Sequence, residues 1–468
     1  MASGFGMIDY FVVLLSFALT AYFMVTKPER LLLLLPTFLT IDFFIPFGSQ
    51  LTPGRLVPLM IGVWVLVNYG ALRTRKYSPW IGAAFFIIFA SFFYALISGD
   101  AGLRSVLRAL NYVNLVFIFL FVYHTAEDKR TFALAVWGLA IAGMLHGGYA
   151  VYQFIAHKIG LPFRGIVYNE FGSGVVGELA GAFRINGLAD EPKRLGYILF
   201  AAALAAAWLL TLRKTTLRQR RILNVTAWGC LGVSLLTYST SYYIVLPIWM
   251  ALYFLISAWV RKFAVISVFL AAGALLVVPS ALTTASDRFA DIVLSRSEEV
   301  AQGLDARFVY RQEFYAQALL KDNPVAVLTG VGLGRYNKVI EEEYGAGAGF
   351  DLEGFVKPLN SQVLEVVLDL GLPGLLLLYG AAAALIWRLG RRGRQRLLVG
   401  GIVSFLAIQS VLIGNLPYLV FSMGMAAAFL GLIEPWKRSM PALKLSQTFS
   451  TESTLELRAF NLQHSRRA

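Results

Sequence analysis

Cysteine is almost absent from this chain of 468 residues, and charged residues are scarce. Its single cysteine, Cys230, lies in an apolar run, which excludes an intramolecular disulfide and a metal centre built from several cysteines. Charged residues make up 15% of the chain and hydrophobic residues 58%, whereas soluble domains average about 25% charged residues. The mean hydropathy is +0.66. This composition favours a membrane protein.

The apolar residues form blocks of about 17 to 25 residues, the length that a helix needs to cross about 30 Å of hydrocarbon. We therefore predict an all-α integral membrane protein with about 13 transmembrane helices, within a range of about 12–14. The first block begins near Asp9 without a basic segment or cleavage site, so we expect a retained helix and no signal peptide. The expected spans are 9–26, 31–48, 56–72, 79–98, 108–123, 131–156, 195–212, 222–238, 240–260, 263–284, 361–387, 397–414 and 418–434.

Lysine and arginine residues predict the orientation of the chain. The net charge of +14 is typical either of nucleic-acid binding or of the cytoplasmic loops of membrane proteins. Short connections on one side hold 19 Lys and Arg residues, whereas those on the other side hold only Arg55, Arg104 and Arg108. The positive-inside rule places the basic connections in the cytoplasm, so we expect the membrane and no nucleic acid as partner. The basic connections are 27–30, 73–76, 129–130, 213–221, 261–262 and 388–396.

The same orientation places the amino terminus and two long connections outside. These two connections carry 13 Lys and Arg residues, which the charge rule permits for long loops. Such an excess suggests a ligand, and an anionic group at the outer membrane face is the simplest one. The expected parts are an N-terminal transmembrane bundle (1–156), an outer loop with an arginine motif (157–194), central transmembrane helices (195–284), a large outer loop (285–360), C-terminal transmembrane helices (361–434) and a cytoplasmic tail (435–468).

The first motif, FRINGLADEPKRLGY at residues 183–197, lies where the chain enters the seventh expected span. Its charged residues are Arg184, Asp190, Glu191, Lys193 and Arg194. A helix amino terminus with three cations would suit a diphosphate at the level of the lipid headgroups. The alternative is that these side chains only anchor the helix by reaching toward the headgroups.

The second motif lies within residues 305–337. Arg307 and Arg311 are four residues apart, so on a helix they share one face and could grip two anionic oxygens. The stretch GVGLG, Gly330–Gly334, is superficially similar to a dinucleotide-binding fingerprint. It lacks a preceding buried strand, a following long helix and the later acidic residue, so we reject that interpretation. We expect a tight turn beside the site, in which Gly330 and Gly332 have a structural role.

The third motif, at residues 360–374, places Glu365 and Asp369 on one face of an otherwise apolar helix. A carboxylate buried in a membrane costs at least about 3 kcal/mol, so such residues usually face a polar cavity or a cation. An arginine of an outer loop is the expected partner. We assign Asp369 a structural role at the site, and the alternative is mere proximity to the headgroups.

Together, the three motifs resemble those of the O-antigen ligases and Wzy-type O-antigen polymerases, which assemble bacterial surface polysaccharides. The resemblance also covers the general plan, an arginine motif ahead of one span and a long outer loop late in the chain, and implies a GT-C-like fold. The matching residues are Arg184, Gly187, Glu191 and Pro192 in the first motif, Arg307, Pro324 and Gly330–Gly332 in the second, and Ser361, Gly371 and Gly374 in the ligase signature.

One position departs from this family. The histidine of the ligase signature falls on Asn360, and none of the four histidines lies in that motif. In the family that histidine is a candidate to activate the acceptor hydroxyl, whereas Asn can orient a hydroxyl but cannot take its proton. Three explanations remain open: a carboxylate such as Glu191 or Glu341 replaces the base, little base is needed, or the chain is inactive.

The resemblance implies an inverting glycosyltransferase without a metal or other cofactor. Its donor would be an undecaprenyl-diphosphate-linked oligosaccharide, used at the periplasmic face of the bacterial cytoplasmic membrane. We expect Asn360 and Glu191 to be catalytic. The cations expected to hold the diphosphate are Arg184, Lys193, Arg194, Arg307 and Arg311.

The acceptor separates two further possibilities. A second lipid-linked glycan would make the protein a polymerase, and lipid A-core would make it a ligase; Asn360 leads us to favour the polymerase. Membrane lipids and a chain-length regulator are further expected partners. A transporter of the same lipids would line a central path with charges, whereas the ionisable residues here collect outside the spans. An inactive scaffold of a polysaccharide assembly complex is a third possibility.

Overall fold

The computed structural model describes most of the expected membrane region. The described residues are 5–41, 52–68, 78–98, 102–163, 178–179, 182–189, 191–212, 215–237, 239, 242–243, 245–247, 249–251, 308–345, 359, 361–390, 393–412 and 415–433. They are almost entirely helical, apart from one hairpin of two short antiparallel strands, β1 (Glu178–Leu179) and β2 (Ala182–Phe183).

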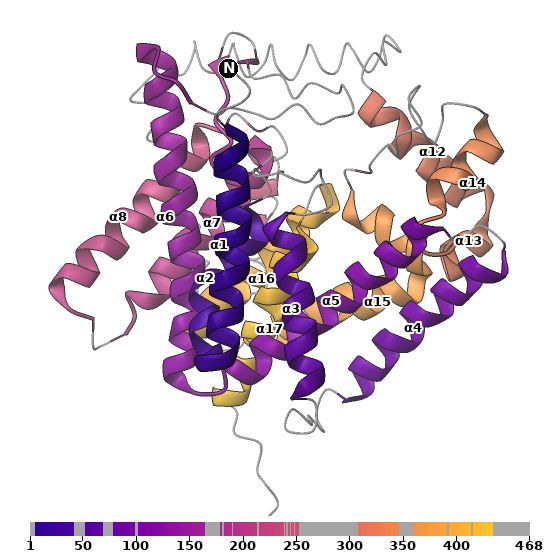
Figure 1. Cartoon of the computed structure of the whole chain (residues 1–468), viewed down its shortest axis with the longest axis horizontal. Coiled ribbons are helices and arrows are strands. Elements are labelled where there is room, and N and C mark those ends of the chain that lie inside the picture. Colours follow the sequence, from indigo (N-terminus) through magenta and orange to yellow (C-terminus); the bar gives the residue numbers. More distant parts are fainter. Residues whose placement is uncertain are drawn as a thin grey trace, which may run out of the picture. The chain divides into compact units, whose positions relative to one another are not determined.

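Most of the helices follow the apolar blocks of the sequence (Figure 1). Those of the first half are α1 (Phe5–Thr26), α2 (Pro28–Thr40), α3 (Pro53–Val67), α4 (Ser78–Ile97), α5 (Leu103–Thr125), α6 (Lys129–Ile159), α7 (Pro192–Leu209) and α8 (Leu217–Leu235). Those of the second half are α12 (Phe308–Asp322), α13 (Pro324–Thr329), α14 (Tyr336–Tyr344), α15 (Gln362–Leu389), α16 (Arg394–Leu412) and α17 (Leu416–Ile433). Most of the expected span 240–260, and all of 263–284, lie outside the described residues.

Within the described residues, five helices are long and apolar enough to cross a membrane: α4, α5, α6, α15 and α17. Their outward side chains are apolar; on α4, Phe86 is 75% exposed and Ile97 is 85% exposed. Such a surface is stable against lipid and not against water. The chain is therefore a multi-pass membrane protein, whereas the count of 13 spans and the GT-C-like arrangement stay predictions.

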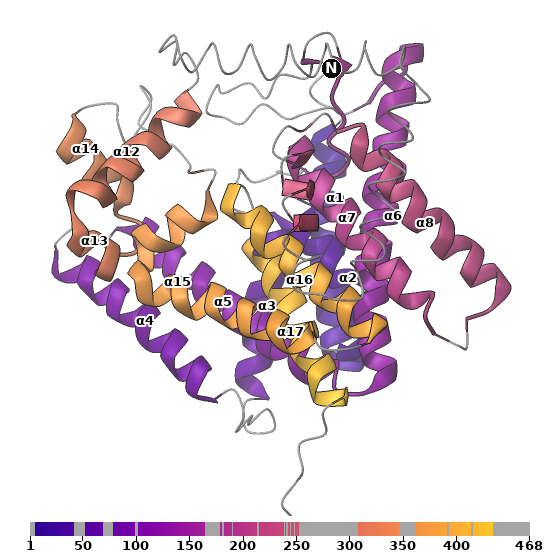
Figure 2. The same cartoon turned by 180° about the vertical axis from the view of Figure 1, so that it is seen from behind.

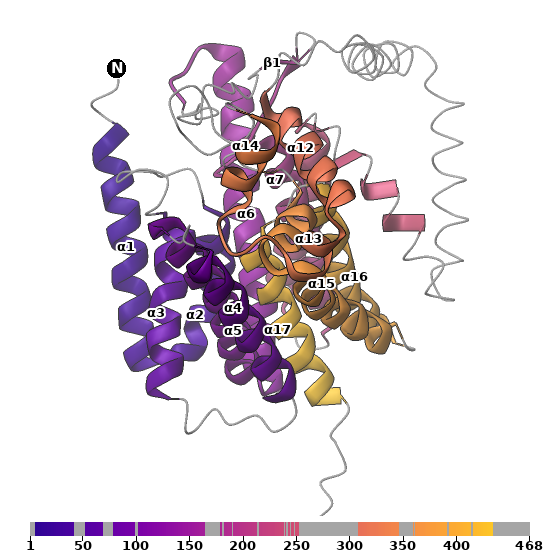
Figure 3. The same cartoon turned by 90° about the vertical axis from the view of Figure 1, so that its right-hand side faces the viewer.

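Small residues allow the helices around α6 to approach closely. α6 packs against α2 and α7, and α7 packs in turn against α8. A Cβ on Gly143 of α6 would lie 2.1 Å from Cβ of Ala202 on α7, so only glycine permits this distance. Close contact through small residues is a usual way for membrane helices to associate. Figure 3 shows α1, α2 and α3 side by side, in agreement with their mutual contacts.

A second group of helices surrounds α15. α15 packs against α4, α13 and α16, and α4 packs against α5. Figures 1 and 2 show the short helices α12–α14 gathered near one end of α15 and α4. Their buried side chains, among them Leu319, Tyr336 and Ile340, form one apolar cluster with Leu368 of α15. This cluster fixes the glycine turn between α13 and α14 against α15.

Candidate functional site

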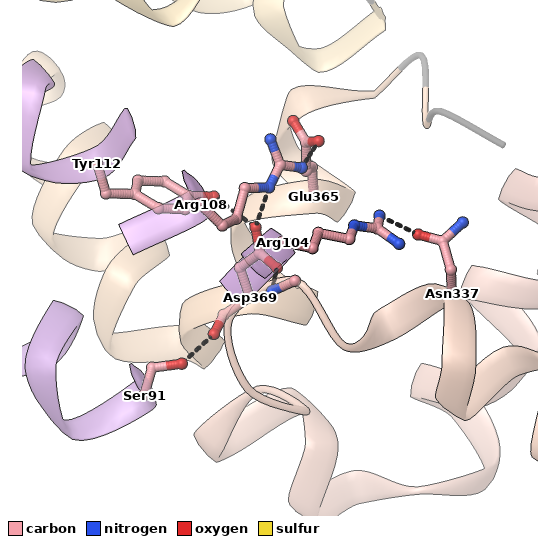
Figure 4. Close-up of polar contacts among 8 residues, drawn as sticks. Ser91, Arg104, Arg108, Tyr112, Asn337, Glu365 and Asp369 are labelled. Carbon is pink, nitrogen blue, oxygen red and sulfur yellow. Dashed lines mark hydrogen bonds and ion pairs between the residues drawn. The ribbon is translucent and has the colours of Figure 1, made fainter. Parts of the chain in front are cut away.

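α15 contains a break at Gly371, whose φ of 68° and ψ of −170° are not helical. Pro373 follows two residues later and has no N–H, so the carbonyl of Asp369 lacks its normal helical donor. The hydroxyl of Ser91 on α4 donates to that carbonyl instead (Figure 4). In a membrane, a free backbone carbonyl costs several kcal/mol, so this bond makes the break tolerable.

The glycine turn between α13 and α14 packs directly against this break. Its glycines all have positive φ angles: 75° at Gly330, 96° at Gly332 and 72° at Gly334. The N–H of Val331 donates to the carbonyl of Leu368 at 2.7 Å. A Cβ on Gly330 would lie 2.8 Å from the backbone N of Gly371, so two glycines meet where the two backbones touch.

A buried ionic cluster holds the glycine turn and the break in α15 against α5. Asp369 is fully buried, and its Oδ2 accepts from Nε of Arg108 at 3.0 Å and from the hydroxyl of Tyr112 at 3.1 Å. Its Oδ1 accepts from the N–H of Gly334 at 3.0 Å. Arg108 also pairs with Glu365, one helical turn before Asp369 (Figure 4). A buried carboxylate with three donors is well compensated, so Asp369 joins α5, α15 and the glycine turn.

Arg104 extends the cluster to α14. It lies one helical turn before Arg108 on α5, and its guanidinium donates to Oδ1 of Asn337. The same guanidinium lies 5.1 Å from the ring centroid of Tyr336, within the range of a cation–π contact. Two arginines one turn apart on α5 thus hold α14 and α15.

The structure gives Asp369 and Glu365 an arginine partner from a helix and not from a long outer loop. The expected span began at residue 108, whereas α5 begins at Leu103, so Arg104 and Arg108 lie within the helix. In the sequence, both arginines had been interpreted only as charges of a connection. The spacing of Arg104, Arg108 and Tyr112 on one helical face was the signal that could have identified them.

The segment before α7 is held by α6. The amide of Gln153 donates to Oδ1 of Asn186 at 2.9 Å, and its oxygen accepts from the N–H of Gly187 at 2.8 Å. The imidazole of His157, one turn later on α6, stacks on the ring of Phe183 with centroids 4.0 Å apart. We call these contacts the α6 clamp. It fixes the backbone on both sides of Arg184.

The charged residues of the first motif lie at or just before the start of α7. Glu191 is the N-cap residue of α7 and Lys193 follows in its first turn; Nζ of Lys193 lies 2.9 Å from Oε2 of Glu191. Arg194 is half-buried in the same turn, and Arg184 is half-buried in the preceding segment. Asp190 lies outside the described residues. The structure thus brings the expected catalytic carboxylate and one expected diphosphate ligand together.

The other expected site residues are described only in part. Asn360 and Arg307 lie outside the described residues, and so does the side chain of Arg311, whose backbone belongs to α12. Ser361, next to Asn360, is the N-cap of α15 and accepts from the N–H of Leu364 at 3.4 Å. The convergence of Arg184, Arg307 and Arg311 on one ligand therefore stays a prediction.

Residues 225–379 match the family model of the O-antigen ligases, over about one third of the chain. This part of the chain is similar to the O-antigen ligases. The matched residues include the glycine turn, Asp369 and the break at Gly371, whereas Arg104 and Arg108 come from α5, outside the matched residues. The first motif also lies outside them. A search of curated proteins finds no match to the chain.

Proposed function

We propose that this protein is an inverting glycosyltransferase that polymerises undecaprenyl-diphosphate-linked oligosaccharides at the periplasmic face of the bacterial cytoplasmic membrane. The observation that carries this proposal is the O-antigen ligase domain in a multi-pass membrane chain. The loops 157–194 and 285–360 share the periplasmic face in this proposal, and the tail 435–468 is cytoplasmic. Membrane lipids and a chain-length regulator are the proposed further partners.

The proposed reaction needs cations at the leaving group. The acceptor hydroxyl attacks the anomeric carbon, the bond to the lipid diphosphate breaks, and negative charge grows on the diphosphate. Fixed cations at that position lower the barrier, because they bind the transition state more strongly than the donor. We assign this role to Arg184, Arg194 and Lys193 at the start of α7, together with Arg307 and Arg311. No metal enters this mechanism.

In this proposal, the ionic cluster around Asp369 positions the backbone, whereas Asn360 and Glu191 act on the substrates. Asp369 and Arg108 satisfy one another inside the protein, so we assign them the positioning of the glycine turn and the first turns of α15. Asn360 directly precedes the N-cap of α15, and we assign it the orientation of the acceptor or donor. Glu191 is the proposed base, and Nζ of Lys193 lies 2.9 Å from its Oε2.

The ligase reaction is the second candidate, and the description of the matched family favours it. We keep the polymerase as the main proposal because an asparagine stands where the ligase signature has histidine. Purified protein with lipid-linked oligosaccharide alone separates the two candidates. A polymerase lengthens the lipid-linked glycan, whereas a ligase forms product only after lipid A-core is added.

The diphosphate-binding role is tested by Arg184→Ala and Arg184→Lys in this transfer assay. Removing a charge-assisted contact of about 1.5–3 kcal/mol should lower the transfer rate at least about tenfold. Lysine should restore only part of the rate, because it keeps the charge and loses the bidentate fork. Arg220→Ala is the matched control, since Arg220 is an exposed arginine on the expected cytoplasmic side. An unchanged rate and product length from folded Arg184→Ala would contradict the diphosphate-binding role of Arg184.

A further inference from the structure

Two basic connections of the expected cytoplasmic side meet in the structure. The side-chain amide of Gln395, at the start of α16, donates to the hydroxyl of Thr211, just after α7, at 2.9 Å. α7 also packs against both α8 and α16. This bond brings together the ends of the connections 213–221 and 388–396, each of which holds five Lys and Arg residues and no Asp or Glu. Two strongly basic segments, far apart in the sequence, are therefore joined at one end of α7.

Other basic connections of the same side are smaller and mixed in charge. Glu29 lies within the connection 27–30, and Asp128 directly precedes Lys129 and Arg130. The positive-inside rule counts Lys and Arg in short connections, and two of them satisfy it in each of these connections. Ten cations without an acidic residue among them therefore exceed what the rule needs and point to an anionic partner.

The arginines of this region do not stabilise the helices that carry them. Arg218 lies in the first turn of α8 and Arg394 in the first turn of α16, and neither turn has an acidic residue. Cations in the first turn of a helix are unfavourable, because the amino terminus already carries partial positive charge. The side chains of Arg218, Arg221 and Arg394 are all exposed. They are therefore accessible to an anion, which would offset this cost.

α8 continues from these arginines as an exposed apolar face. Arg221 lies three residues after Arg218 and Val225 four residues further, so all three share one face of the helix. Trp228 extends that face by almost another turn. Val225 is 73% exposed and Trp228 is 74% exposed. A cationic turn followed by an apolar face matches a ligand that has an anionic head and an apolar tail.

We propose that this corner of the protein binds an anionic phospholipid of the cytoplasmic leaflet. Its phosphate lies beside Arg218 and Arg221, within the positive field of Arg394, and an acyl chain follows α8 along Val225 and Trp228. Basic sites between membrane helices on the cytoplasmic side are a usual place for the headgroups of such lipids. A soluble phosphate has the same charge and no tail, so the apolar face of α8 favours the lipid. This proposal does not depend on the proposed transfer reaction.

The test compares two neighbouring arginines of α8. Native mass spectrometry of the purified protein measures the binding of phosphatidylglycerol and of phosphatidylcholine, and wild type should prefer phosphatidylglycerol. Arg221→Gln should raise Kd for phosphatidylglycerol about fivefold, which corresponds to about 1 kcal/mol for one cation near an anionic headgroup. Arg220→Gln is the matched control, because Arg220 lies off this face and its Nε donates to the hydroxyl of Thr215 at 3.0 Å. Its Kd should match wild type.

Three results would overturn this proposal. Equal affinity of wild type for the two lipids would show that the charge of the headgroup is not recognised. An equal Kd for Arg220→Gln and Arg221→Gln would show that the face of α8 does not form the site. Displacement of bound phosphatidylglycerol by inorganic phosphate at the same concentration would identify a soluble anion as the ligand. Because the measurement records lipid binding and no glycan transfer, failure of the proposed function would leave its outcome unchanged.

Discussion

Two irregular segments lie beside the membrane helices of this protein, and they are held in different ways. Residues 184–189, before α7, are held by the neutral amide of Gln153. Residues 330–334, before α14, are held by the backbone at the α15 break and by Asp369, which is itself paired with Arg108. Both segments have their backbone groups satisfied by a neighbouring helix, as a membrane requires.

The two segments differ in whether charged side chains hold the backbone. In the second segment, each charge of the cluster has a partner inside the protein, and a buried ion pair of this kind is stable only when all its members are satisfied. In the first segment a neutral side chain fixes the backbone, and the cations Arg184, Lys193 and Arg194 lie in this segment or in the first turn of α7. The charges of the second segment therefore position its backbone, whereas those of the first segment do not hold the backbone, and we assign ligand binding to them from the motif in which they lie.

The largest expected effect comes from the glycine at the α15 break. A Cβ on Gly371 would lie 2.5 Å from the carbonyl oxygen of Leu328 and 2.7 Å from the N of Gly330, and its φ is positive. Because both neighbours are backbone atoms, Gly371→Ala should lower the free energy of unfolding by about 3 kcal/mol or more. Thermal unfolding in detergent measures this change. Gly380→Ala is the matched control.

That control lies on the same helix, where an added Cβ meets nothing within 4 Å. Gly380→Ala should leave Tm unchanged or raise it, because alanine favours a helix over glycine by about 1 kcal/mol. Equal Tm values for the two variants would contradict the role of Gly371, since the glycine turn would then not depend on the break.

The α6 clamp should give the second largest effect. Gln153→Met keeps the shape of the side chain and removes its hydrogen bonds, which leaves Asn186 and the N–H of Gly187 without this partner. The expected cost is about 1–3 kcal/mol. Because the segment is released, trypsin should cleave after Arg184 faster, and transfer should fall. Val151→Met, at an exposed position of α6, is the control and should leave both unchanged.

Much of the helical arrangement was predictable because a membrane span has a strong signal. Blocks of apolar residues predicted helices that the structure has at α1–α8 and α15–α17, with ends that differ by a few residues except at α2, which ends at Thr40 and not at residue 48. The glycine turn and the shared face of Glu365 and Asp369 followed from short-range spacing. Such features depend on residues that are close in the sequence.

The contacts between distant segments were not predictable in this way. Arg108 and Asp369 are 261 positions apart in numbering, and no short pattern links them. Apolar composition predicted that the span begins at residue 108, whereas α5 begins at Leu103. A paired arginine can lie inside the helix, since its carboxylate partner offsets the cost of burial. Gln153 lies in an apolar helix and gave no signal of its contact with Gly187.

The smallest expected effect is at the opposite end of α6. Asp128 is its N-cap, and Oδ1 accepts from the N–H of Arg130 at 2.6 Å and of Thr131 at 2.9 Å. These bonds, that from Thr131 above all, lower the pKa of the Asp128 carboxyl below its ordinary value. Asp128→Ala should cost about 1 kcal/mol at neutral pH. Since the folded pKa is the lower one, this contribution is present above the ordinary pKa and is lost as the pH falls through the folded value.

Asp128→Ala tests whether the α6 clamp or the general stability of α6 holds residues 184–189, because Asp128 lies far from the clamp and its contribution depends on pH. Unfolding measured from neutral to acid pH should show wild type approaching Asp128→Ala at low pH, whereas Asp128→Asn should keep a cap without this pH dependence. Asp128 lies more than six helical turns from Gln153, so cleavage after Arg184 should stay at the wild-type rate. If Asp128→Ala speeds that cleavage as much as Gln153→Met does, then the general stability of α6, and not the clamp, holds the segment that carries Arg184.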